Sequence, residues 1–339
     1  MQIEGYSIDL EKVAQTIKKK GYKTVAIQIP EGLKRYVLKI VEFLEYETHA
    51  TMIVSADPCF GACDIVNNKL KNLDVEFVIH VGHTPIPEIE NYCIPTTFVN
   101  ALSTKDITKA VEKSLSFLEG KRIGIVTTAQ HLHSLDVAEN ILQKNNFKPI
   151  LTTGDARIST KGQILGCDFS AGMNIIDKVD CFLFIGSGTF HPVGLLLSSK
   201  KPVIAADPYT NSVKKQEIDE LKDIILRQRY GAIANSKNAS KFGILVGLKR
   251  GQQRMDLAYR VRKTFDAFNK KSLIIALDNF SPISLQGFSN IDCFVSIACP
   301  RIAIDDYLQY KIPIITSIEL EIVLGKRKWE DYRFDQILG

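Results

Sequence analysis

The chain has 339 residues, of which 45% are hydrophobic and 24% are charged, and its formal net charge is +5. This composition is typical of a globular protein with a substantial core, and the length favours two or three domains over one. The longest strongly apolar stretches, such as residues 181–185, have the length of a strand and are too short to span a membrane. No basic tract interleaved with aromatic residues indicates a nucleic-acid partner. We therefore expect a cytoplasmic protein whose partners include no membrane and no nucleic acid.

Residues 10–20 are expected to form an amphipathic helix that ends at Gly21, and no signal peptide is expected before it. After this helix the same order of elements occurs three times: an apolar strand, a helix, and then a second, a third and a short fourth strand. The first strands are expected at 24–30, 122–128 and 241–247, the second at 50–54, 149–153 and 272–277, the third at 75–81, 181–185 and 293–298, and the fourth at 95–99, 202–206 and 313–316.

Alternating strands and helices are typical of parallel sheets with helices on both faces. Three units of about 100 residues each fit this pattern better than one very large sheet. The divergent internal repetition predicts an α/β protein built from a triplicated unit, with a charged helical linker at 211–240 between the second and third units.

Seven cysteines are present, and in a cytosolic chain metal binding, catalysis or core packing explains them better than disulfides do. Cys63, Cys167 and Cys299 each follow a predicted strand of a different unit, in a polar loop with Gly or Pro. Parallel strands place such loops at one edge, where three thiolates could hold a metal ion or a four-iron cluster with one iron left open. Loop amides and helix N-termini are expected to favour the thiolates, while Gly61 and Gly166 would let the backbone approach a cluster. Three unrelated buried cysteines are the alternative.

The remaining cysteines give no complete metal motif. Cys59 and Cys63 form a C-x3-C pair, but the usual radical S-adenosylmethionine signature needs a third cysteine at the position of Val66. A zinc site at this pair would lack a second pair of ligands nearby. Cys181 and Cys293 fall within apolar strands and are expected to be core residues.

A second loop, at residues 186–192, could bind a carboxylate or a ribose through its backbone amides. It is not a Walker loop, and it does not match the dinucleotide-binding fingerprint. His131 and His191 could contact a ligand, or each could be a packing residue held by a hydrogen bond.

Charged residues near the predicted loop edge could neutralise a carboxylate. Arg157, Arg250 and Arg301 are the candidates, with ordinary surface ion pairs as the alternative. Asp305 and Asp306 are expected to be a charge pair at a helix N-terminus rather than a catalytic dyad.

Several longer motifs carry a resemblance to a known family. They are Pro-Glu-Gly-Leu at 30–33, Phe-Gly-Ala-Cys-Asp at 60–64, Thr-Thr-Ala-Gln-His at 127–131, Gly-Gln-Ile-Leu-Gly-Cys at 162–167, Gly-Ser-Gly-Thr-Phe-His-Pro at 186–192, Asp-Pro-Tyr at 207–209, Ala-Cys-Pro-Arg at 298–301 and Tyr-Arg-Phe-Asp at 332–335. Through these motifs, which run over almost its full length, the chain resembles the archaeal diphthamide-synthesis enzymes, the 2-(3-amino-3-carboxypropyl)histidine synthases.

The resemblance implies a homodimer in which three Rossmann-like domains surround a [4Fe-4S] cluster. The domains are expected at residues 1–103, 104–215 and 216–339, the last of which includes the linker helix. Matched motif by motif, the cluster ligands are Cys63, Cys167 and Cys299, one from each domain. Cys63 rather than Cys59 fits the first motif, and whether Cys59 can replace it is left open.

The resemblance also implies the reaction. The protein would be an atypical radical S-adenosylmethionine enzyme that transfers the 3-amino-3-carboxypropyl group to a histidine of elongation factor 2, the first step of diphthamide synthesis. Methylthioadenosine would be released, and an unidentified electron donor would be needed. The carbon of S-adenosylmethionine that lies nearest the cluster would decide which bond breaks. The expected S-adenosylmethionine pocket comprises Gln130, Arg157, Gly186, Ser187, Gly188, His191 and Arg301.

Two other functions would use the same fold. A quinolinate-synthase-like dehydratase would use the cluster as a Lewis acid and need no reductant, so methylthioadenosine formed only with a reductant distinguishes the two enzymes. A non-catalytic scaffold that binds elongation factor 2 would have no use for the three motif cysteines, and failure to take up iron would favour it.

Overall fold

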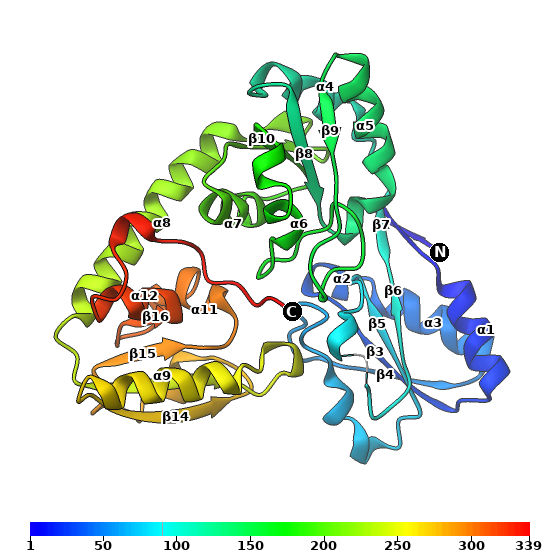
Figure 1. Cartoon of the computed structure of the whole chain (residues 1–339). Helices are drawn as coiled ribbons and strands as arrows, with labels where there is room; N and C mark the ends of the chain where they lie inside the picture. The colour runs from blue at the N-terminus through cyan, green and yellow to red at the C-terminus, as the bar shows by residue number, and fades with distance from the viewer. Residues whose placement is uncertain (90) are drawn as a thin grey trace.

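The computed structural model describes residues 1–89 and 91–339, and three parallel sheets are arranged in it around a common centre (Figure 1). In each of these sheets the first strand of the unit lies between the second and the third, and the fourth lies on the far side of the third. The predicted α/β class with parallel sheets is thereby confirmed. That the three units arose by triplication, and that the domains divide after residues 103 and 215, stay predictions.

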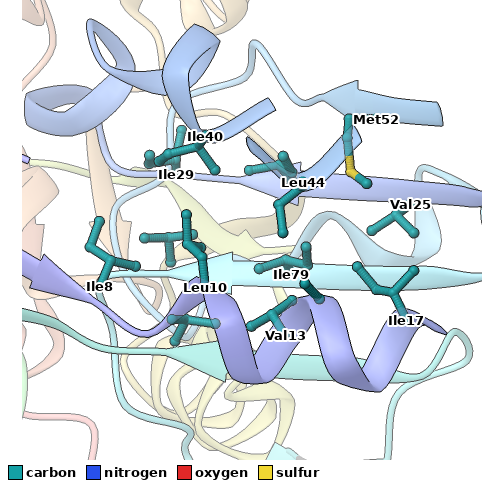
Figure 2. Packing of buried hydrophobic residues seen from close by; sticks show 14 of the residues in the cluster. Ile8, Leu10, Val13, Ile17, Val25, Ile29, Ile40, Leu44, Met52 and Ile79 are labelled. Carbon is teal, nitrogen blue, oxygen red and sulfur yellow. The ribbon is translucent and has the colours of Figure 1, made fainter. Parts of the chain in front are cut away.

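The first sheet has the order β4-β3-β5-β6 and is covered by α1 and α3. Its elements are α1 (Leu10–Lys20), β3 (Thr24–Gln28), α2 (Glu31–Lys34), α3 (Val37–Thr48), β4 (Thr51–Val54), β5 (Phe77–Val81) and β6 (Thr96–Val99). Figure 2 shows Ile17 of α1 and Leu44 of α3 meeting the strand residues Val25 and Ile79 in one cluster. Burying each such aliphatic side chain contributes about 1.5–3 kcal/mol, so this packing holds the helices on the sheet.

The first helix has the predicted bounds, and the residues on either side of it explain them. The side chain of Asp9 accepts a hydrogen bond from the backbone N–H of Lys12, which caps the N-terminus. Gly21 ends the helix with φ of +71°, in the left-handed region that glycine adopts without steric cost.

The second sheet has the order β12-β11-β10-β8-β9, and β12 is antiparallel to its neighbour. Its elements are α4 (Thr108–Ser114), β8 (Arg122–Thr127), α5 (Leu135–Lys144), β9 (Lys148–Ile150), α6 (Ser170–Met173), β10 (Cys181–Ile185), α7 (Phe190–Ser199), β11 (Val203–Asp207) and β12 (Ser212–Val213). Alternate residues of β10 face opposite helix layers: Phe182 and Phe184 pack towards α6 and α7, whereas Leu183 packs towards α4 and α5. Both faces are therefore buried, as the continuous apolar run predicted.

The strand predicted at 149–153 is shorter in the structure. Only Lys148–Ile150 pairs with β8, and the end of β8 is instead joined by a later segment, because the N–H of Thr127 donates to the carbonyl of Gly162 and that of Ile164 to the carbonyl of Thr127. Because residues 162–164 pair with the end of β8, Cys167 follows close to that end.

The third sheet has the order β14-β13-β15-β16. Its elements are β13 (Lys241–Gly247), α9 (Met255–Ala267), β14 (Lys271–Leu277), α10 (Pro282–Leu285), β15 (Cys293–Ser296), α11 (Pro300–Ile304), β16 (Ile314–Thr316) and α12 (Ser317–Val323). The predicted linker is the helix α8 (Lys215–Ser236), which packs on α7 of the second sheet and on α12 of the third (Figure 1). It therefore ties these two sheets together.

A small antiparallel sheet was not predicted. It has the order β1-β2-β7 and consists of β1 (Gln2–Ile3), β2 (Tyr6–Ile8) and β7 (Ala101–Ser103). Short 3-10 helices complete the described structure: η1 (Val66–Asn68), η2 (Lys71–Leu73), η3 (Pro87–Ile89), η4 (Leu115–Phe117), η5 (Ala129–Ser134), η6 (Ile176–Lys178), η7 (Arg250–Gln252), η8 (Tyr307–Gln309) and η9 (Trp329–Asp331). Among the described residues, no helix combines the length and the apolar character needed to cross a membrane.

Candidate functional site

A cavity of about 700 Å³ lies where loops of the three sheets meet. Its lining includes Cys63, which follows β4, Cys167, which follows β9, and Cys299, which follows β15. All three loops leave the carboxyl ends of parallel strands, the edge at which open α/β sheets bind ligands. The structure thus brings together three cysteines of which the successive ones are 104 and 132 residues apart in sequence.

A loop of the third sheet holds Cys63 in place. The N–H of Gly251, in η7, donates to the carbonyl of Cys63, and the side-chain amide of Gln252 lies 3.5 Å from its Sγ. A Cβ at position 251 would lie 2.5 Å from the Cβ of Cys63, so only glycine fits there. Gly61, by contrast, has room for a side chain, with Cys63 Sγ 3.6 Å from where a Cβ would be.

Cys167 is held by the second sheet and by a segment far along the chain. The N–H of Ile337 donates to the carbonyl of Cys167 over 2.8 Å. The neighbouring Gly166 lies against the ring of Phe190, which would be 2.3 Å from a Cβ at that position. The glycine therefore makes room for an aromatic ring at the cavity wall.

Cys299 is the N-cap residue of α11, and Pro300 occupies the first position of the helix. Proline suits this position because it lacks the N–H that would be unpaired there and already has a helical φ. The turn is closed by the N–H of Ile302, which donates to the carbonyl of Cys299. Cys299 is thereby held on a fixed backbone at the wall of the cavity that it lines.

Burial raises the pKa of the thiols of Cys63, Cys167 and Cys299, to about 12 for Cys299. Proximity adds to this effect, because a thiolate at either of the other two positions further raises the pKa of Cys167. A backbone hydrogen bond from Arg301 lowers the pKa of Cys299, which is the effect expected of loop amides and helix N-termini, but burial outweighs it. Three thiolates at this site therefore need a positively charged group between them.

At least two of the three thiols lie further apart than the ligands of a single ion. Among the described residues, the three are not a set of ligand atoms that all lie within 4.8 Å of one another. A single tetrahedral zinc ion, with Zn–S of about 2.3 Å, holds its sulfurs only about 4 Å apart. Thiolate ligands are also the ones that iron–sulfur clusters take. The donor set therefore fits a cluster, and the three thiols as they lie do not form a mononuclear site.

An arginine lies at the wall of the same cavity. Arg301 stacks on the ring of Phe190, and its Nε lies 2.5 Å from Oδ2 of Asp305. Its Nη1 is buried and has no hydrogen-bond partner among the described residues. Burial lowers the pKa of Arg301 to about 10, which leaves the group charged at neutral pH. A charged guanidinium with an unused donor is suited to bind a carboxylate.

The residues beside Arg301 complete this wall. Asp305 and Asp306 both line the cavity and lie between α11 and the 3-10 helix η8, of which Asp306 is the N-cap residue, so the pair is at a helix N-terminus as expected. His191 stacks on Phe184, and burial followed by the charge of Arg301 lowers the pKa of its imidazole to about 3. The imidazole is therefore neutral and can accept a hydrogen bond.

Of the other predicted pocket residues, Gln130 lines the cavity, and its amide donates to the carbonyl of Gly82. Arg157 is buried behind the wall, where it donates to the carbonyl of Gly251 and lies 4.0 Å from Asp168. In the described part of the chain, Arg157 and the turn residues Gly186, Ser187 and Gly188 are not among those that line the cavity.

Two further candidates also lie outside this lining. His131 is buried and packs edge-on against Tyr209, which matches its packing interpretation. Arg250 donates to the carbonyl of Asn91 near the surface.

Sequence reasoning missed two groups of residues at this site. Lys249 forms a buried ion pair with Asp64, and no local pattern indicates a partner 185 residues away. Cys59, His80 and His83 place their ligand atoms within 4.8 Å of one another. This second group had a signal: His80 and His83 form an H-x-x-H pattern at the end of the predicted third strand, next to the loop of Cys59.

Comparisons with known proteins agree with this geometry. The family model for diphthamide synthesis proteins matches residues 29–333. The 2-(3-amino-3-carboxypropyl)histidine synthase of Pyrococcus horikoshii is 35% identical, over 98% of this chain and 94% of that protein, and the protein of the same name from Methanocaldococcus jannaschii is 31% identical, over 98% and 93%. A crystal structure of Dph2 from Pyrococcus horikoshii with a 4Fe-4S cluster matches with a TM-score of 0.88 and 33% identity, covering 98% of this chain and 94% of that chain. The chain therefore belongs to the diphthamide synthesis protein family.

Proposed function

We propose that this protein transfers the 3-amino-3-carboxypropyl group of S-adenosylmethionine to a histidine of elongation factor 2, the first step of diphthamide synthesis. The observation that carries the proposal is the convergence of Cys63, Cys167 and Cys299, from three sheets, on one cavity. It is supported by the two archaeal relatives, whose name describes a synthase of this modified histidine, a transferase. The fold match to Dph2 with a 4Fe-4S cluster supports the cofactor.

Cys63, Cys167 and Cys299 are the ligands in this proposal. A [4Fe-4S] cluster bound there would supply one electron for cleavage of a sulfur–carbon bond of S-adenosylmethionine, next to the iron that no cysteine occupies. The chain itself fixes the three thiols on separate, rigid supports: η7 against Cys63, the segment at Ile337 against Cys167, and α11 under Cys299.

Arg301 orients the substrate in this proposal. The unpaired Nη1 of Arg301 binds the carboxylate of S-adenosylmethionine, and Asp305 or Asp306 accepts a hydrogen bond from its α-ammonium group. Both aspartates and the guanidinium line the same wall as Cys299, so the amino-acid end of the substrate is held at the cysteines. Holding that end fixes which carbon–sulfur bond is presented, which is the main contribution that a protein makes to such a reaction.

The rest of the wall is mostly apolar, with Phe190, Ile86 and Phe280 among its residues. An apolar wall limits the access of water to a reactive fragment. Neutral His191 and Gln130 provide hydrogen-bonding groups for the nucleoside part. The loop 186–188 stays a predicted contact of S-adenosylmethionine, as do the homodimer and an electron donor.

The test is an anaerobic reaction of the reconstituted protein with S-adenosylmethionine labelled in its aminocarboxypropyl part, dithionite and archaeal elongation factor 2. We expect label on one histidine of the factor, an equal amount of methylthioadenosine, and about four irons per chain. Replacing Cys63, Cys167 or Cys299 by Ala should lower iron content and abolish labelling, whereas Cys181→Ala, in the core strand β10, should keep both.

Full iron content in all three cluster variants would contradict the ligand assignment. Methylthioadenosine formed without a reductant, or label that never reaches the factor, would contradict the transfer reaction. Binding of the factor by a protein that never takes up iron would favour the scaffold function instead.

A further inference from the structure

A second group of metal-ligating side chains lies beside the cavity. Cys59 is in the loop after β4, His80 is in β5, and His83 is in the loop after β5. One ligand atom from each of them lies within 4.8 Å of the other two, and in the described part of the chain this is the one such group of Cys, His, Asp or Glu side chains. The side chains of Cys59 and His80 are buried, and His83 lines the cavity.

A glutamine holds His80 in one orientation. The side-chain amide of Gln28 donates to the carbonyl of Asp64, so its Oε1 is the acceptor that lies 3.0 Å from Nδ1 of His80. The Nδ1 of His80 therefore carries the proton, and the lone pair of Nε2 is directed away from Gln28. Donation of one ring N–H to an amide or carboxylate oxygen is the arrangement that orients metal-binding histidines.

The two imidazoles meet at the position that an ion would occupy. Nε2 of His80 lies 2.9 Å from Nδ1 of His83, so one proton is shared between two nitrogen lone pairs. Burial lowers the pKa of His80 to about 3 and that of His83 to about 4, which keeps both rings in the neutral form that binds metals. When an ion replaces the shared proton, that proton can move to Nε2 of His83, and the thiol of Cys59 loses its own.

We infer that Cys59, His80 and His83 bind a single divalent metal ion of the zinc class, at a site separate from the three-cysteine site. One thiolate and two imidazoles are ligands that zinc accepts at about 2.3 and 2.0 Å. A tetrahedral ion holds two such nitrogens about 3.3 Å apart, so the two imidazoles, now 2.9 Å apart, need to separate only slightly, and the sulfur already lies within 4.8 Å of both. Three protein ligands leave a fourth position for water or another donor. The inference does not depend on the proposed reaction.

The position of this site suggests what the ion does. Cys59 and Cys63 belong to one loop, and the ion would fasten that loop to the end of β5 through His80 and His83. The backbone leading to Cys63 would then be fixed on both sides, by the ion and by η7. The three residues are therefore positioning residues for Cys63, and Cys59 has a role of its own rather than that of a substitute ligand.

The test uses the full chain with Cys63, Cys167 and Cys299 all replaced by Ala, which removes the proposed cluster ligands. Cobalt(II) is the probe, because a thiolate bound to it gives a charge-transfer absorption that oxygen and nitrogen ligands do not give. We expect one cobalt per chain with this band, displaced by one equivalent of zinc. Adding Cys59→Ser should remove the band, and adding His83→Gln or Gln28→Met should weaken binding by about tenfold or more.

Two substitutions serve as matched controls in the same background. Cys93 and His133 are exposed residues of the same types, outside the group of ligand atoms, and Cys93→Ser and His133→Gln should leave the band and the affinity unchanged. A band that survives Cys59→Ser, or the absence of cobalt binding by a triple variant with a native circular dichroism spectrum, would overturn the inference.

If the triple variant does not fold, metal analysis of the wild-type protein tests whether the second site binds an ion. After anaerobic purification with zinc present, we expect one zinc per chain in addition to iron. Cys59→Ser should lose the zinc while Cys181→Ala keeps it. Equal zinc content in Cys59→Ser and the wild type would overturn the inference, whatever the iron content or the activity.

Discussion

Lys249 and Asp64 form a buried ion pair, with 2.7 Å between Nζ and Oδ2, that joins the third sheet to the loop of the first. Asp64 directly follows Cys63, and Lys249 directly precedes η7, whose Gly251 and Gln252 contact that cysteine. The ammonium group also lies 4.8 Å from the centre of the Phe60 ring. This ion pair thus aligns η7 with the loop of Cys63, and the separation of these two segments determines the position of the Cys63 thiol at the cavity.

Replacing Lys249 by Met should destabilise the protein more than a surface substitution does. A buried carboxylate left without its partner costs about 3–5 kcal/mol in the free energy of unfolding, measured by urea denaturation. Lys222→Met, which breaks the more exposed pair with Asp223, should cost less than about 1 kcal/mol. Adding Asp64→Leu to Lys249→Met should restore part of the loss. Equal effects of the two single substitutions would show that the buried pair has no special role.

A methyl group at position 251 should displace Cys63. The Cβ of Gly251→Ala would lie 2.5 Å from the Cβ of Cys63 and 2.6 Å from its Cα, so one of the two loops must move. Such overpacking costs about 1–3 kcal/mol, and the iron content after reconstitution should fall with it. Gly287→Ala is the control, since no atom lies within 4 Å of its added Cβ. Unchanged iron and stability in Gly251→Ala would mean that this contact is not restrictive.

Removal of the guanidinium of Arg301 should weaken binding of S-adenosylmethionine. A hydrogen bond to a charged group contributes about 1.5–3 kcal/mol, so Arg301→Gln should raise the dissociation constant by about 10- to 100-fold in anaerobic calorimetry. Arg301→Lys keeps the charge but not the planar guanidinium, so its dissociation constant should lie between those of the wild type and Arg301→Gln. Arg250→Gln, outside the cavity, should bind like the wild type. An Arg301→Gln protein with unaltered affinity would remove Arg301 from the proposed pocket.

One side chain of the linker helix α8, that of Arg229, should contribute strongly to the stability of the protein. Arg229 of α8 is fully buried, forms an ion pair with Glu319 at 2.7 Å, and donates to the carbonyls of Ala303 in α11 and Ile314 in β16. Arg229→Met leaves Glu319 buried without its partner and should cost about 3–5 kcal/mol of unfolding free energy.

The control for this substitution is Arg227→Met, on the exposed side of the same helix. It should change the unfolding free energy by less than about 0.5 kcal/mol. Similar values for the two variants would contradict a structural role of Arg229.

The sequence predicted the three parallel sheets because their strands are continuous apolar runs. β10 has the predicted bounds of Cys181–Ile185, and β13 those of Lys241–Gly247. The sheet of β1, β2 and β7 could not be predicted, because its strands have only two or three residues and the third lies about a hundred residues from the other two. Strand length and local periodicity carry no information about such pairings.

The cavity was predicted in outline and not in detail. The shared position of three cysteines at strand ends led to the cysteines that line the cavity. The contacts that hold them, such as Gly251 against Cys63 and Ile337 against Cys167, join segments up to 188 residues apart, and no sequence spacing encodes them. Arg301 lines the cavity, whereas Arg157 lies behind its wall. This difference likewise depends on packing and not on residue type.

No sheet carries more than one of the three thiols that line the cavity, so their spacing is a property of how the sheets are docked. A small rigid-body rotation of one sheet would change that spacing and leave every strand pairing intact. Binding at the cavity and docking of the sheets are therefore thermodynamically linked: a ligand that prefers one spacing stabilises one arrangement of the sheets. By reciprocity, any contact that fixes that arrangement, even on the outer surface, raises affinity at the centre by the same factor.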